Sequence, residues 1–207
     1  MDDQLVYLTM DAFSILGVVV FAISGALYAA EKKMDILGFI LIGTVTGLGG
    51  GTLKDLLLGV SPVSWVTDPS NIYLCVAAAT ITYYSVNMLH SRQRWILWMD
   101  AIGLAVFAVM GARSALAADV SPLIAVVMGV MTATFGGIMR DVLCAQVLTL
   151  MRPEIYVTAA LLGSFTYVVC VLFNMPDSLA VIMSFLVSFC LRGAAIAYKL
   201  TLPNRYL

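Results

Sequence analysis

The stretch GLGGGTLKD occupies residues 47–55, and a related stretch, GGIMRD, occupies residues 136–141. In each, adjacent glycines are followed three residues later by a basic–acidic pair, Lys54–Asp55 in the first and Arg140–Asp141 in the second. Glycine costs a helix about 1 kcal/mol relative to alanine, and a charge at the bilayer centre costs about 2.5 to 3.5 kcal/mol. Because both stretches lie inside long apolar segments, they predict two kinked or unwound membrane helices whose charges face protein or water.

These two stretches belong to a longer internal repeat. The segment Phe21–Ala26 matches Phe107–Ala112 at an offset of 86 positions, and the same offset places Thr46 on Thr132 and Lys54 on Arg140. One constant offset that joins apolar and charged matches indicates a duplication. Each copy holds three spans, an odd number, so the second copy must enter the membrane from the opposite side. Inverted repeats place their shared site near the midplane, where helices are interrupted.

The composition is that of a membrane protein. Of the 207 residues, 62% are hydrophobic and only 11% are charged, with a mean hydropathy of +1.01, whereas soluble domains are about 25% charged. A net charge of −1 argues against nucleic-acid binding, which needs a basic footprint. The four cysteines stand singly, and no CxxC, HExxH, GxSxG or phosphate-loop motif is present. We therefore expect neither an enzyme nor a bound metal or cofactor.

Apolar runs of about 20 residues, the length that crosses a bilayer, predict an all-α protein with seven transmembrane helices. The arrangement is a single membrane domain over residues 1–207, with repeat 1 at about 10–90, repeat 2 at about 96–174 and an extra helix at about 178–200. The predicted spans are Asp11–Ala29, Ile36–Leu58, Ile72–Leu89, Trp95–Arg113, Ser121–Leu148, Pro153–Phe173 and Ser178–Leu200.

The distribution of lysine and arginine predicts the orientation, because cytoplasmic loops carry the excess of these residues. An external N-terminus and a cytoplasmic C-terminus place seven basic residues on the cytoplasmic side: Lys32, Lys33, Arg92, Arg94, Arg152, Lys199 and Arg205. In this orientation Lys54 lies toward the outside and Arg140 toward the cytoplasm. We further expect Asp11 and Asp100 to cap helix starts, and Arg192 to extend toward the interface.

Two interpretations of each feature stay open. The glycines are either a helix break or, through the GxxxG spacing of Gly43, Gly47 and Gly51, a surface for close helix packing. The charges are either part of a conduction path or a structural ion-pair lock. Since neighbours in sequence do not share a helix face, we expect Lys54 and Arg140 to pair with acids from elsewhere. The spacing also places the hydroxyls of Thr46 and Thr132 along a common path.

The paired glycine-rich and basic–acidic segments, on a plan of three, three and one helices, resemble the prokaryotic branch of the trimeric intracellular cation (TRIC) channels. The resemblance implies a homotrimer in the inner membrane, with a pore in each subunit for K⁺ and also Na⁺, gated at the second and fifth helices, with bound lipid as a further partner. By position, the implied pore residues are Gly49, Gly50, Gly51, Lys54, Gly136, Gly137 and Arg140, with Asp55 and Asp141 holding the basic groups or the kinks. Animal members carry Lys-Glu-Val where this chain has Lys54-Asp55-Leu56.

A small amino-acid transporter, for a solute such as glycine, is the alternative. Interrupted helices in inverted repeats also suit alternating access. The charge-balanced quartet of Lys54, Asp55, Arg140 and Asp141 suits a zwitterion. Selectivity and the gating stimulus are open under either interpretation.

Overall fold

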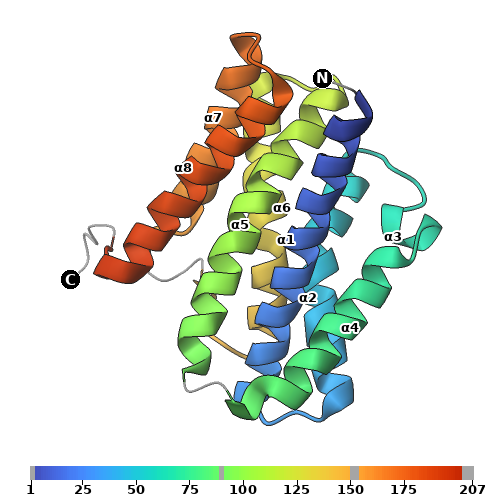
Figure 1. The fold of residues 1–207 in the computed structure, drawn as a ribbon, viewed down its shortest axis with the longest axis vertical. Coiled ribbons are helices and arrows are strands. Elements are labelled where there is room, and N and C mark those ends of the chain that lie inside the picture. The colour runs from blue at the N-terminus through green and yellow to red at the C-terminus, as the bar shows by residue number, and fades with distance from the viewer. Residues whose placement is uncertain (1–2, 89–90, 150–153, 202–207) are drawn as a thin grey trace.

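The computed structural model describes residues 3–88, 91–149 and 154–201, with side chains described from residue 11 onward. Within these residues the chain is helical, and the only β pairing is an isolated bridge between Glu154 and Thr201. Figure 1 shows the long helices running side by side in one bundle. The elements are α1 (Asp3–Glu31), α2 (Ile36–Leu57), α3 (Ser64–Thr67), α4 (Ser70–Ser85), η1 (Val86–Met88), α5 (Arg92–Ala117), α6 (Pro122–Leu143), α7 (Val157–Leu172) and α8 (Asp177–Tyr198).

A helix lies at each of the seven predicted spans. Five helices, α1, α2, α5, α6 and α8, are long and apolar enough to cross a membrane, so the chain is a multi-pass membrane protein. The other two, α4 and α7, have 16 residues each, about 24 Å at 1.5 Å per residue. Because a bilayer core is about 30 Å thick, the count of seven spans stays a prediction.

The boundaries differ most at the first span, where α1 begins at Asp3 and not at Asp11, so Asp11 lies within the helix and does not cap its start. The fifth span also differs. It was expected to reach Leu148, but α6 ends at Leu143 because Ala145 adopts a left-handed conformation with φ of 49°. The chain then folds back against the helix it has just left. The short helix α3 was not predicted, since its four residues carry no periodic signal. The predicted positions at Leu89, Arg152, Pro153 and Arg205 lie outside the described residues.

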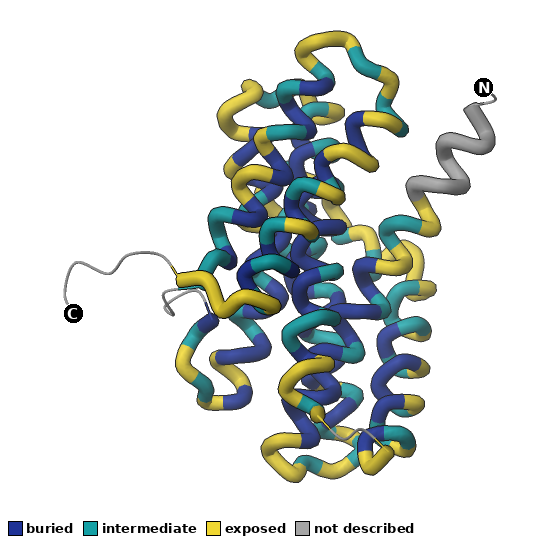
Figure 2. The backbone as a smooth tube through the Cα atoms, turned by 60° about the vertical axis from the view of Figure 1, so that its left-hand side comes forward, coloured by how far each residue is buried: buried dark blue, intermediate teal, exposed yellow. Residues whose placement is uncertain are grey.

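Helices α1 and α5 form the centre of the bundle. They pack against each other and against α6, α1 also contacts α2 and α4, and α5 also contacts α7 and α8. In Figure 1, α7 and α8 flank α5 on one side while α4 lies on the other. Figure 2 shows that burial is concentrated along this centre and that the connections at both ends are exposed.

The packing of α1 on α5 is reciprocal between the two repeats. A Cβ atom on Gly17 would lie 3.4 Å from the ring of Phe107, and a Cβ atom on Gly103, the repeat counterpart of Gly17, would overlap the ring of Phe21. The rings of Phe21 and Phe107 lie beside each other, with centroids 5.1 Å apart. Two pairs of positions related by the same offset of 86 therefore make mirrored contacts at the centre of the bundle.

Candidate functional site

The glycines of α2 and α6 let the two helices cross in backbone contact. A Cβ atom on Gly50 would collide with the carbonyl oxygen of Thr132, and one on Gly136 would collide with that of Thr46. Gly49 lies at the same crossing, where its Cβ atom would be 3.4 Å from the Cα atom of Gly136. These mirrored contacts leave no room for a side chain, so close packing is the role of these glycines in this structure.

The unwound stretch expected in the second and fifth helices is absent, which leaves only a kink within a continuous helix to be tested. Both α2 and α6 are α-helical throughout, including residues 47–51 and 136–137. The sequence argument weighed the intrinsic cost of glycine, about 1 kcal/mol each, without the contacts that a side chain would prevent. Tertiary packing keeps the helices intact, and the kink stays a prediction.

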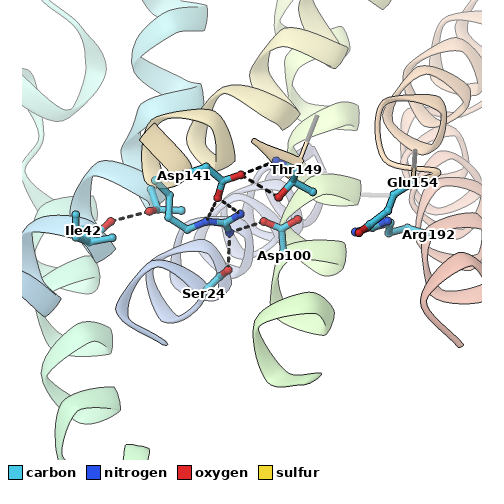
Figure 3. A network of polar contacts seen from close by, with 9 residues as sticks. Ser24, Ile42, Asp100, Asp141, Thr149, Glu154 and Arg192 are labelled. Atoms are coloured by element: carbon cyan, nitrogen blue, oxygen red, sulfur yellow. Dashed lines mark hydrogen bonds and ion pairs between the residues drawn. The ribbon is translucent and has the colours of Figure 1, made fainter. Parts of the chain in front are cut away.

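Arg140 lies at the C-terminal end of α6 and is almost completely enclosed, with a side chain that is 1% exposed. Its guanidinium contacts Asp141 Oδ1 through Nη2 at 2.9 Å, and Asp100 Oδ1 through Nη1 at 2.7 Å. The same Nη1 donates a hydrogen bond to the hydroxyl of Ser24 at 2.8 Å. The guanidinium carbon lies 4.2 Å from the ring centroid of Tyr28, a cation–π distance. We call this cluster the Arg140 site. Figure 3 shows Ser24, Asp100 and Asp141 of this site with their dashed contacts.

Asp141 has a second function in the Arg140 site. Its Oδ2 accepts hydrogen bonds from the backbone N–H of Thr149 at 2.8 Å and from the Thr149 hydroxyl at 2.9 Å. The carboxylate thus fixes the returning loop after α6 and neutralises Arg140 at the same time. A buried carboxylate with charge-assisted partners on both oxygens is well compensated for its loss of water.

Lys54 lies in the last turn of α2 and is more exposed than Arg140. We call Lys54 and its surroundings the Lys54 site. Its ammonium lies 2.8 Å from Asp55 Oδ1, and its side chain is 22% exposed. Asp55 Oδ2 accepts hydrogen bonds from the backbone N–H and the hydroxyl of Ser64, at 2.8 Å and 2.6 Å. Asp55 therefore fixes the loop after α2, as Asp141 fixes the loop after α6. A cavity of about 120 Å³ adjoins Lys54, and Gly51, Ser14, Met110 and Ser114 are among its lining residues.

Two expectations about the acidic partners need correction. Each basic residue pairs with its neighbour in sequence, because both pairs stand in the last helical turn, where the carboxylate reaches the next loop and the long basic side chain folds over it. Asp100 was expected to cap a helix start, but α5 begins at Arg92 and Asp100 is 3% exposed within it. Arg140 does contact an acid from elsewhere, and that acid is Asp100.

The remaining predicted site residues lie at or beside the helix crossing. The hydroxyls of Thr46 and Thr132 donate to the carbonyl oxygens of Ile42 and Met128 in their own helices, at 2.6 Å and 2.7 Å. Both threonines are buried, although Thr132 also borders the cavity at Lys54. Gly137 faces the Arg140 site, where its Cβ atom would lie 2.8 Å from the hydroxyl oxygen of Tyr156. The counterpart Gly51 has nothing within 4 Å of that position.

Sequence reasoning missed a second buried arginine. Arg192 was expected to reach toward the interface, but it is 1% exposed and donates to Glu154 Oε2 at 2.8 Å and to the carbonyl oxygen of Ile155 at 3.3 Å. Its guanidinium carbon lies 5.1 Å from the ring centroid of Tyr156. Glu154 precedes α7, whereas Arg192 lies in α8, so only the fold brings this acid to Arg192. Asp100 could have been found, because a lone acid in an apolar run implies a buried basic partner.

The comparisons with known proteins follow the same architecture. A family profile described as "Glycine transporter" matches residues 11–87 and 97–171, one match in each repeat. The UPF0126 inner membrane protein YadS of Escherichia coli is 40% identical over 192 residues, covering 92% of this chain and 93% of that protein. The structure of the TRIC trimeric intracellular cation channel orthologue from Rhodobacter sphaeroides is 44% identical with a TM-score of 0.91, covering 93% of this chain and 99% of that one.

The chain belongs to the prokaryotic TRIC family. A further structure, of a prokaryotic TRIC channel, is 32% identical with a TM-score of 0.88 and covers 93% of this chain and 98% of that chain. These relatives are described as channels or membrane proteins and not as enzymes. In this TRIC fold, the Lys54 site is at the C-terminal end of α2 and the Arg140 site is at the C-terminal end of α6.

Proposed function

We propose that this TRIC protein is a cation channel with its path inside the subunit, between α2 and α6. The observation that carries this proposal is the cavity at Lys54, which is bordered by Thr132, the residue whose carbonyl oxygen meets Gly50 at the backbone crossing. Gly137, next to Gly136 of the same crossing, faces the buried Arg140 site. Two solved relatives at 44% and 32% identity are described as TRIC channels. In this proposal the conducted ions are K⁺ and also Na⁺.

The duplication organises this path. The mirrored contacts of Gly50 with Thr132 and of Gly136 with Thr46 support two inverted repeats of three helices, with α8 as the seventh, and a site on the axis between them. With the N-terminus outside and the C-terminus in the cytoplasm, Lys54 is at the outer end and Arg140 at the inner end. The path residues are those predicted from sequence: Thr46, Gly49, Gly50, Gly51, Lys54, Asp55, Thr132, Gly136, Gly137, Arg140 and Asp141. The channel is a homotrimer in the inner membrane of a prokaryote, in contact with lipid, and needs no cofactor.

Gating takes place at the basic groups. A lysine or arginine in a cation path repels the passing ion, and the Arg140 guanidinium also fills the space between α1, α5 and α6. Opening requires that Arg140 leave Asp100 and Ser24, whereas Lys54 needs only to swing within its cavity. The structure thus resembles a closed channel whose barrier is at Arg140.

Single-channel recording of two variants tests this gating role. Arg140→Ala is expected to raise the open probability, because it removes the barrier, and Lys54→Ala is expected to change the conductance with a smaller effect on opening. Unchanged open probability and conductance in both variants would rule out gating by these residues.

The description of the matching family profile names a second candidate, a transporter for glycine, whereas the two solved relatives are described as channels. Reconstitution separates the two functions. A channel gives unitary currents in a planar bilayer, and proteoliposomes then show no saturable uptake of radiolabelled glycine. A transporter gives saturable uptake without unitary currents.

A further inference from the structure

The Arg140 site and the Lys54 site are at matching positions of the repeat. Buried side chains surround Arg140, whereas a cavity adjoins Lys54. The offset of 86 pairs Asp100 with Ser14, and Tyr28 with Ser114. It also pairs Ser24 with Met110. Two of these three residues that contact Arg140, Asp100 and Tyr28, thus have smaller counterparts in the other repeat. The third, Ser24, has a methionine as its counterpart.

Those three counterparts occupy the corresponding place around Lys54. Ser14, Met110 and Ser114 all line the cavity beside Lys54 and Gly51, and all three are half-buried. Around Arg140, by contrast, Asp100, Ser24 and Tyr28 are buried, at 3%, 0% and 8% exposure. Residues paired by the offset of 86 therefore occupy corresponding places around the two basic groups. The cavity at Lys54 corresponds to the place that side chains fill around Arg140.

Size and charge explain the difference. The ring of Tyr28 covers the Arg140 guanidinium at 4.2 Å, whereas a serine at position 114 leaves that volume open. Asp100 gives Arg140 a second carboxylate at 2.7 Å, whereas Ser14 adds no carboxylate at Lys54, whose one acidic partner among the described residues is Asp55. An arginine held by two carboxylates and an aromatic face is more firmly fixed than a lysine with one partner.

We infer that Tyr28 and Asp100 are positioning residues that determine which end of the path is closed, and that exchanging them with Ser114 and Ser14 reverses this sidedness. The inference rests on the proposed path between α2 and α6, but not on whether an ion or an amino acid uses it. A closed channel needs a seal at one point of this path, and a transporter seals the two ends in turn.

Cysteine accessibility tests the inference through one pair of repeat positions. Ser24→Cys reports on the Arg140 site and Met110→Cys reports on the Lys54 site. Both are placed in a background where Cys144, Cys170 and Cys190 are changed to serine. Cys75, which is completely buried, is kept as a reporter of folding. Purified protein in nanodiscs is treated with a charged methanethiosulfonate reagent, and labelling is read by mass spectrometry.

In the otherwise unchanged chain, Met110→Cys is expected to react and Ser24→Cys to stay protected. The double variant Tyr28→Ser, Asp100→Ser is expected to make Ser24→Cys react about tenfold faster or more, because thiol reactivity follows exposure. The reverse variant Ser14→Asp, Ser114→Tyr is expected to protect Met110→Cys to a similar degree. Cys75 stays unlabelled in both.

If Ser24→Cys stays protected and Met110→Cys stays reactive while Cys75 shows both variants to be folded, the inference is wrong. The reverse variant keeps the test decisive if loss of Tyr28 and Asp100 unfolds the protein. Labelling does not depend on current, so failure here leaves the proposed channel standing. Absence of unitary currents from the unmodified protein would overturn the channel and leave the labelling result intact.

Discussion

At the scale of single residues, the buried charge of Arg140 is the feature on which most of the site depends. Its side chain has two carboxylate partners and one hydroxyl, all within 3.0 Å. Such a cluster is stable only while all its members are present, since removing one partner leaves an uncompensated charge in a low dielectric. The Lys54 pair, partly open to a cavity, carries a smaller penalty of this kind.

Arg140→Gln is therefore expected to lower the free energy of unfolding by about 3 to 5 kcal/mol, because Asp100 and Asp141 lose their counter-charge. Arg113→Gln is the matched control. Arg113 pairs with Asp177 at 3.0 Å, but both side chains are about one third exposed, at 32% and 34%. Its loss should cost about 0 to 1 kcal/mol. The measurement is reversible unfolding in mixed micelles, and equal losses in the two variants would contradict this view of the cluster.

The hydrogen bonds of Asp141 to the loop after α6 give a second prediction. Thr149→Val removes the hydroxyl donor at 2.9 Å but leaves the backbone donor in place. Hydrogen bonds to charged groups contribute about 1.5 to 3 kcal/mol, so we expect a loss in that range by the same unfolding assay. Thr166→Val, whose exposed hydroxyl bonds only within its own helix, should be close to neutral. A neutral Thr149→Val would show that Asp141 does not hold this loop.

At the scale of helices, the crossing of α2 and α6 depends on two glycines in backbone contact. Gly50→Ala is expected to destabilise the protein by about 1 to 3 kcal/mol, because the new methyl group meets the rigid carbonyl of Thr132 and the helices must separate. Gly51→Ala, one position along, meets nothing within 4 Å and should be neutral or stabilising by up to about 1 kcal/mol. Thermal unfolding of the two variants gives shifts of opposite sign if this is correct, and two similar losses if the helix itself is the sensitive element.

The sequence was sufficient to predict the seven long helices, but not the short helix α3 or the contacts between helices. Apolar length and the offset of 86 placed all seven long helices, because membrane spans and duplications leave a signal along the chain. Whether residues 47–51 break a helix or pack it could not be decided without the partner helix. The roles of Asp100 and Arg192 were predicted wrongly for the same reason, since their partners, the buried Arg140 and the half-buried Glu154, are distant in sequence.

At the scale of the whole molecule, the proposed path between α2 and α6 has an open site at Lys54 and a sealed site at Arg140. The reciprocal glycine contacts support a symmetric framework, and the residues around the two basic groups make its two ends different. This combination suits a gated path for small cations within each subunit. It also explains how a charge-poor protein tolerates so many buried charges, since most are paired beside that path.

The central claim is that this path conducts cations, and bilayer recording of the purified protein in asymmetric KCl tests it most directly. With a tenfold KCl gradient, we predict unitary currents whose reversal potential lies near the K⁺ equilibrium potential, about 59 mV in magnitude. If K⁺ is replaced by Na⁺ on one side and the gradient is kept, the reversal potential should keep the sign expected for a cation-selective channel. A reversal potential of the opposite sign, or the absence of unitary currents together with saturable glycine uptake, would contradict the account.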